Sequence, residues 1–155
     1  MTDVDLELRQ GESLVSAVEE QLYRQITELM IDGDQIATTA FGPATIDRDM
    51  PSFARSSLTS PQDARDWHTR NASRPSLAVY AVTVEEVVEG GRYVVDDSAA
   101  PLVEGEVRAP AHCFVDYRGM SRPERKTLRA HLWFRATARG EIPTAPTLPD
   151  GQLVA

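Results

Sequence analysis

The sequence predicts an α+β fold in which a small mixed or antiparallel sheet packs with an N-terminal and a C-terminal helix. Three patterns predict it: apolar residues recur with helical spacing after Ser13, an almost unbroken apolar run covers Leu77–Val84, and a capped helical pattern begins at Ser121. The 155 residues are close to the common size of one domain. We therefore expect a single domain over 1–155, with 1–12 and 142–155 as flexible or extended tails.

Two helices are predicted in the first half of the chain. Ser13 can cap the first and Gly33 can end it, and its apolar stripe consists of Leu14, Val18, Leu22, Ile26, Leu29 and Met30. This stripe either packs on the core of its own domain or pairs with a second copy of the chain. The second helix is expected to begin after Ser60, because serine caps helices, Pro61 suits the first position and Asp63 suits the positive end of the helix dipole.

The stretch between Asp34 and Ser60 has no clear periodicity, and Gly42-Pro43 and Met50-Pro51 interrupt it. It predicts a long polar loop, and long loops in compact domains are often functional. Guanidinium and hydroxyl groups match the oxygens of phosphates and carboxylates. The candidate ligand-binding residues are therefore Arg48, Arg55, Ser56 and Ser57. The alternative is that they are solvated loop residues.

Leu77–Val84 is the strongest strand pattern, because its β-branched and aromatic residues suit burial on both faces. We expect it to be a central strand. A turn at Gly90-Gly91 leads into a shorter strand over Arg92–Val95, which ends at Asp96-Asp97-Ser98. Two carboxylates fall short of the six or more oxygens that calcium prefers, so this ending is interpreted as a turn.

Chemically capable side chains are most concentrated in Ala111–Gly119, a predicted strand bounded by Pro110 and Gly119. Side chains alternate along a strand, so His112 and Asp116 should share one face with Phe114 between them. Each lies about 7 Å from Phe114 along the strand, so the two are too far apart for a hydrogen bond but can flank a shared ligand. The alternative is that both are hydrogen-bonded to neighbouring loops. His68, on the second helix, is a further candidate for lining a cleft and is otherwise a surface residue.

The pattern Ser121-Arg122-Pro123-Glu124 is typical of a capping box and predicts a long C-terminal helix that ends before Gly140. The helix is locally basic, with Arg122, Arg125, Lys126, Arg129, Arg135 and Arg139. An acidic partner surface or an acidic loop of the same chain fits such a helix, and so does a solvated face. The tail from Ile142 contains three prolines and is expected to be extended.

Composition limits the classes of function. The formal charge of −8 argues against nucleic-acid binding, which needs clustered lysine and arginine. One cysteine forms no internal disulfide, and with three scattered histidines it offers no zinc-ligand spacing, so no metal site is expected. The chain has no secretory leader pattern and no run of about 20 apolar residues, which predicts a cytoplasmic protein without membrane contact. Phosphate-loop, nucleophile-elbow and zinc-protease motifs do not occur in the sequence.

The middle third of the chain resembles the ADP-ribosyltransferase family. The resemblance lies in Ser57-Leu58-Thr59-Ser60, the following helical segment, the Leu77–Val84 strand and Glu104-Gly105-Glu106-Val107. It implies an NAD-dependent enzyme in which Glu106 stabilises the oxocarbenium-like sugar or positions the acceptor. It also implies that Ser57 and Thr59 help to shape the NAD pocket.

Three functions follow as hypotheses. The first is a small cytoplasmic binding or accessory domain that acts with a protein partner in a larger bacterial system and needs no cofactor. The second is an ADP-ribosyltransferase-like enzyme that uses NAD. The third is a structural subunit of a homo-oligomer that self-associates through its N-terminal helix. An enzyme requires several of five residues to converge on one pocket: the candidate catalytic residues His112, Asp116, Glu106 and His68, together with Arg55.

Overall fold

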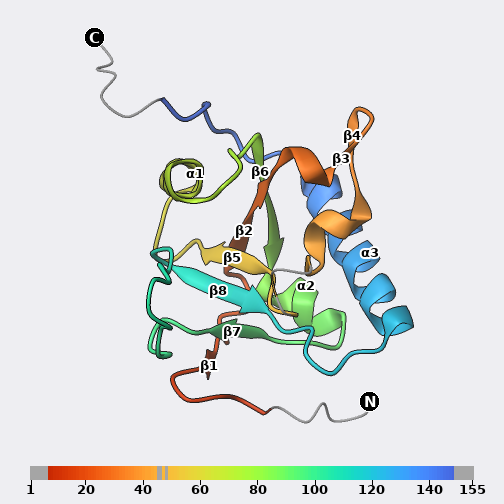
Figure 1. The fold of residues 1–155 in the computed structure, drawn as a ribbon. Helices are drawn as coiled ribbons and strands as arrows, with labels where there is room; N and C mark the ends of the chain where they lie inside the picture. Colours follow the sequence, from red (N-terminus) through yellow and green to blue (C-terminus); the bar gives the residue numbers. More distant parts are fainter. Residues whose placement is uncertain (1–6, 45–46, 48, 149–155) are drawn as a thin grey trace.

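A six-stranded antiparallel sheet forms the centre of the molecule (Figure 1). The computed structural model describes residues 7–44, 47 and 49–148. The strand order is β1-β7-β8-β5-β2-β6. The strands are β1 Ser13–Leu14, β2 Gln21–Ile26, β5 Ser52–Arg55, β6 Ala78–Thr83, β7 Val94–Asp96 and β8 His112–Val115. A separate hairpin pairs β3 Ile31–Asp32 with β4 Gln35–Ile36, and short 3-10 helices cover Glu28–Met30 and Thr38–Phe41.

Helices cover both faces of the sheet. The longest, α3 Arg122–Arg139, packs Leu128, Leu132 and Ala136 into the main core against one face, together with α2 Val84–Glu89. On the other face, α1 Pro61–Asn71 makes its main strand contacts with β2 and β6, with Ala64 against a smaller apolar cluster. In Figure 1, α1 and α3 lie on opposite sides of the sheet.

The expected α+β class, the antiparallel sheet and the C-terminal helix are confirmed. Ser121 caps α3 and forms the predicted capping box with Glu124, and Ser60 caps α1 with Pro61 inside its first turn. The predicted alternation in the Ala111–Gly119 segment is also present. Cys113, Val115 and Tyr117 point into the main core, although the strand itself covers only His112–Val115.

The predicted N-terminal helix over 13–33 is wrong. Its residues form β1, β2 and a 3-10 turn instead. β2 is hydrogen-bonded to β5 on one side and β6 on the other, and Leu22 and Ile26 enter the main core while Tyr23 joins the cluster on the opposite face. A four-residue interval such as Leu22 to Ile26 suits one helix face, but it also suits one strand face, because four is an even number. Hydrogen bonding to a strand on each side favours the strand over the helix for this segment.

Two further expectations need correction. The Ala78–Thr83 strand lies at the end of the sheet order rather than at its centre, and its outer edge is covered by a single antiparallel bridge from Val79 to Ile142. Its apolar run reflects burial between α1 and α3, not two flanking strands. The segment 34–60 is not one loop, because it contains β4, a 3-10 helix and β5. Helix α2 was not expected, although Thr83 and Glu86 form a capping box before it.

Candidate functional site

Three side chains that are distant in the sequence form a continuous hydrogen-bonded relay. His112 Nε2 lies 2.9 Å from Ser52 Oγ, and His112 Nδ1 lies 2.6 Å from Asp97 Oδ1. The imidazole and the carboxylate are mostly shielded, with 17 % and 18 % of their side chains exposed, whereas Ser52 is an exposed residue. The serine is therefore more open to solvent than the histidine and the aspartate.

Strand order accounts for this relay. β7, β8 and β5 are consecutive in the sheet. Ala54 of β5 is the partner of His112 in β8, so Ser52, two residues before Ala54, points to the same face as His112. Asp97 follows the last residue of β7 and reaches the imidazole from the other side. Each side chain of the relay thus comes from a different strand or strand end, and β8 supplies the histidine in the middle.

The geometry assigns complementary roles to the two ring nitrogens. A carboxylate oxygen accepts hydrogen bonds, so the Asp97 contact places the proton of a neutral His112 on Nδ1. Nε2 then carries the lone pair and accepts the Ser52 hydroxyl proton. A base that is oriented by a third group and hydrogen-bonded to a hydroxyl is the arrangement that activates serine as a nucleophile.

The relay opens into a broad groove of about 1330 Å³. Residues of α1, of the long connection from β7 to β8, of β2 and β5 and of the segment 39–44 line this groove. Leu102, Val107 and Pro110 line it from that connection, and Ala64 and Trp67 line it from α1. A concave site that contains a hydrogen-bonded nucleophile and base is the expected form of an active site.

Gln25 brings an amide to the face of the sheet that carries Ser52. Tyr23 of β2 pairs with Ala54 of β5, and Gln25 and Ser52 each lie two residues from that pair, on the same face. Ser76 Oγ lies 2.6 Å from Gln25 Oε1 and orients the amide. The other end, Nε2, is buried and has no hydrogen-bond partner among the described residues. Gln25 also lines the groove.

Arg24 supports the backbone of the candidate nucleophile from the opposite face of β2. It is 5 % exposed, and its guanidinium donates to the carbonyls of Ala40 and Ser52, both at 2.8 Å, and of Gly42 at 3.4 Å. It also lies 5.3 Å from the centre of the Phe53 ring. Burial lowers the pKa of Arg24 from its usual value, yet an arginine remains charged, so a buried cation holds the start of β5.

A second polar cluster fixes the same strands on the other face. Arg55 of β5 bonds Glu20 at 3.0 Å and Asp96 of β7 at 2.7 Å, which spans β8 between them. Ser57 Oγ donates to Glu20 at 2.6 Å, and Ser56 Oγ accepts from the backbone N–H of Gln21. These three predicted ligand-binding residues, Arg55, Ser56 and Ser57, are thus engaged within the protein and do not line the groove. Arg48 lies outside the described residues.

This cluster predicts a loss of stability in acid. Burial opposes the charged form of Glu20, but hydrogen bonds from Arg55 and Ser57 outweigh it and lower its pKa below the ordinary 4.5. A carboxyl whose pKa is lower in the folded state stabilises the fold above its unfolded pKa, and that stability is lost as pH falls. We expect the free energy of unfolding, measured by urea titration, to fall as pH drops from about 4.5 through the lower pKa of the folded state.

Glu20→Gln provides the matched test of this prediction. It should cost about 2 kcal/mol at neutral pH, less than a fully buried pair, because Arg55 keeps Asp96 as a partner. It should also flatten the acid dependence, since one of the titrating carboxyls is removed. An acid profile identical to that of the wild type would contradict the assignment to this cluster.

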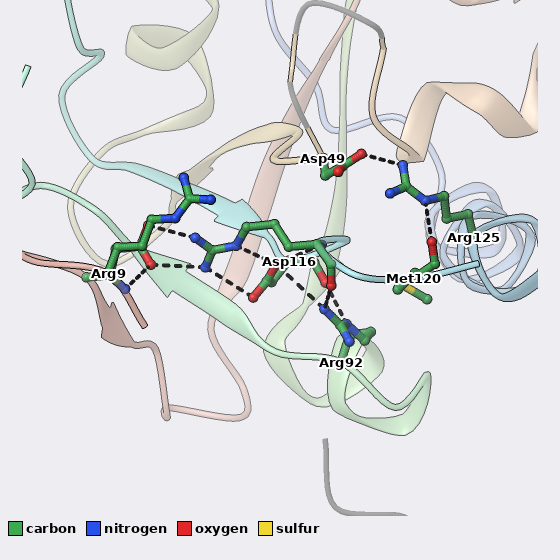
Figure 2. A network of polar contacts seen from close by, with 8 residues as sticks. Arg9, Asp49, Arg92, Asp116, Met120 and Arg125 are labelled. Carbon is green, nitrogen blue, oxygen red and sulfur yellow. Dashed lines mark hydrogen bonds and ion pairs between the residues drawn. The ribbon is translucent and has the colours of Figure 1, made fainter. Parts of the chain in front are cut away.

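Asp116 belongs to a different hydrogen-bond network from the Ser52–His112–Asp97 relay. Figure 2 shows it with Arg9, Arg92 and a neighbouring ion pair of Asp49 with Arg125. Asp116 Oδ1 accepts from both the backbone and the side chain of Arg118 at 2.9 Å, and Arg92 donates to the Asp116 carbonyl. His112 and Asp116 therefore do not line the same groove. Asp116 fits the alternative reading, in which local hydrogen bonds satisfy it.

His68 and Glu106 line the same groove as His112. His68 Nε2 lies 3.0 Å from the Arg74 carbonyl, and burial lowers the pKa of His68. Of the five residues whose convergence was to decide for an enzyme, His68, Glu106 and His112 therefore share one groove, while Arg55 and Asp116 do not line it. Ser52 and Asp97 were not among the candidates. Asp97 was interpreted as a turn residue and Ser52 as part of a polar loop.

Comparisons of the chain with known protein families, with curated proteins and with solved structures give no match. The functional reading of the groove therefore rests on its own residues. Within residues 7–44, 47 and 49–148, no group of three or more histidine, cysteine or acidic side chains is placed to hold a metal ion. In the same part of the chain, no helix has the length and apolar character to cross a membrane.

The basic helix α3 satisfies many of its charges inside the protein. Arg125 pairs with Asp49, Arg135 with Glu89 at 2.7 Å and Arg139 with Glu86 at 2.9 Å. The intramolecular alternative for this helix is therefore present in the structure. The hypothesis that this helix binds an acidic partner surface is weakened, because these three arginines already have carboxylate partners.

Proposed function

We propose that the chain is an enzyme of the acyl-transfer class, which uses Ser52 as its nucleophile to hydrolyse a carboxylic ester. The observation that carries this proposal is the relay from Ser52 through His112 to Asp97, open to a groove. A lone serine near a histidine is common. A serine, a histidine and an aspartate within hydrogen-bonding distance in that order supply the nucleophile, the base and the group that orients the base.

The proposed reaction has two steps. Ser52 Oγ attacks the ester carbonyl while His112 Nε2 takes its proton, and Asp97 stabilises the imidazolium. The tetrahedral intermediate then expels the alkoxide, which receives that proton from His112, and an acyl-serine remains. In the second step His112 removes a proton from water, the resulting oxygen attacks the acyl-serine, and Ser52 regains its proton as the carboxylic acid leaves.

Gln25 is the side chain that we assign to the developing negative charge on the carbonyl oxygen. Its Nε2 has no partner among the described residues, and Gln25 lines the groove that contains Ser52. An amide donor that reaches this oxygen in the tetrahedral state stabilises that state more than the ground state. Ser76 acts through Gln25 as a positioning residue, since it binds the other end of the amide.

Covalent labelling tests the proposal directly. An alkyl fluorophosphonate reacts with activated serines, so we expect a single adduct that peptide mapping locates on Ser52. Ser52→Ala should abolish the adduct, while Ser73→Ala should retain it, because Ser73 is an exposed serine that lines the same groove without a place in the relay. Labelling that is absent, or that persists in Ser52→Ala, would refute the proposal.

An ADP-ribosyltransferase-like activity is the second candidate for the same groove. Its specific support is that Glu106 and Thr59, two residues of the resemblance, both line the groove. Ser57, the third, is hydrogen-bonded to Glu20 instead. Titration with NAD, followed through the fluorescence of Trp67 in the groove wall, tests this candidate. Saturable binding that Glu106→Gln weakens would favour it over ester hydrolysis.

A binding domain that acts with a protein partner stays a hypothesis with reduced support. This hypothesis rested partly on an amphipathic N-terminal helix, but strands form there instead. Several arginines of the basic helix form ion pairs within the protein. Self-association through that first helix loses its structural basis for the same reason.

A further inference from the structure

Exposed apolar side chains line the groove that contains the proposed nucleophile. Leu102 and Val107, on the connection from β7 to β8, are 47 % and 74 % exposed, and Leu58, which precedes α1, is 60 % exposed. All three line the groove that contains Ser52 and His112. The two walls of the groove thus present apolar surface beside the relay, whereas a purely structural surface would bury or disperse it.

The charged side chains that line the groove have both signs. Asp63, Asp97 and Glu106 contribute carboxylates, and Arg24, Arg70, Arg74 and Arg108 contribute guanidinium groups. Arg108, the cation nearest to these apolar residues in sequence, donates to the carbonyls of Ser98 at 3.0 Å and Ala100 at 2.9 Å. Its guanidinium therefore ties the connection to the turn after Asp97 and is already engaged in hydrogen bonds.

We infer that the Ser52 site takes neutral esters with an apolar acyl chain, which lies between Leu102 and Val107 on one wall and Leu58 on the other. This inference rests on the proposed function and adds a substrate class to it. Transfer of the acyl chain from water to these side chains provides binding free energy, while a charged end of the acyl chain would lose hydration beside the same apolar side chains.

A series of p-nitrophenyl esters tests the inference. From acetate through butyrate to hexanoate, kcat/KM should rise by up to about 4-fold for each methylene that is fully buried. The hemisuccinate ester, of similar length to the butyrate but anionic, should be a poorer substrate than the butyrate. In Leu102→Ser and Val107→Ser, the ratio of hexanoate to acetate rates should fall, whereas Phe134→Ser should keep it, since Phe134 is exposed but lies outside the groove.

The outcomes distinguish a wrong substrate class from a wrong proposed function. If the fluorophosphonate labels Ser52 but acetate and hexanoate react equally, or the hemisuccinate is preferred, the substrate class is wrong and the serine site stands. If Ser52 reacts with neither the esters nor the fluorophosphonate, the proposed function fails and the inference fails with it. A hexanoate preference that survives Leu102→Ser and Val107→Ser in the same chain would also overturn the placement of the acyl chain.

Discussion

Replacement of Ser52 by alanine is expected to lower kcat/KM for a reactive ester by about 10³-fold or more, because the covalent step then has no nucleophile. His112→Gln should cause a loss of similar size, since the base that takes the hydroxyl proton is removed. Residues that act as a unit are not additive, so the Ser52→Ala and His112→Gln double variant should be no slower than either single variant. The measurement is steady-state hydrolysis of p-nitrophenyl butyrate, corrected for spontaneous hydrolysis.

Asp97→Asn distinguishes a relay from a simple pair of serine and histidine. An amide at this position can donate a hydrogen bond to Nδ1, which moves the imidazole proton to Nε2 and removes the lone pair that Ser52 needs. We expect a loss of about 10²–10⁴-fold in kcat with the fold retained. Circular dichroism and urea unfolding provide the check on the fold. Full activity in Asp97→Asn would show that Asp97 has no part in the reaction.

The local parts of this fold could be predicted from the sequence. Serine caps, prolines in the first turn and Glu124 at the third helical position mark the starts of α1 and α3, because these signals act within one helical turn. The alternation around β8 was also readable, since it depends only on neighbouring residues. β2 was misread because its assignment depends on pairing with two other strands, which its own sequence does not contain.

The candidate site was predictable only in part, for the same physical reason. His112 stood out, because histidine is rare in this chain and lies in a strong strand pattern. Its partners are 60 residues before it, at Ser52, and 15 residues before it, at Asp97. Only the order β7-β8-β5 brings them together. Within its own strand, His112 shares a face with Asp116. Its hydrogen bonds instead run to neighbouring strands, where side chains on the same face lie closest.

Arg24→Met is expected to destabilise the protein by about 3 kcal/mol. Three buried or partly buried carbonyls lose a charged donor, and such hydrogen bonds each contribute about 1.5–3 kcal/mol, but removal of the buried charge offsets part of that loss. Methionine retains an unbranched apolar stem of comparable length, which limits the packing loss. Arg122→Met is the control, since Arg122 is exposed on α3 and such surface changes usually stay within about 0.5 kcal/mol. Urea unfolding at neutral pH measures both variants.

The same variant links the core to the candidate site. Arg24 donates to the carbonyl of Ser52, so its loss should loosen the residue that carries the nucleophile. At a temperature where Arg24→Met remains folded, the fluorophosphonate should label Ser52 more slowly than in the wild type, whereas Arg122→Met should leave the labelling rate unchanged. Lost stability with an unchanged labelling rate would assign Arg24 a purely structural role. A stability within about 0.5 kcal/mol of the wild type would contradict the assigned hydrogen bonds themselves.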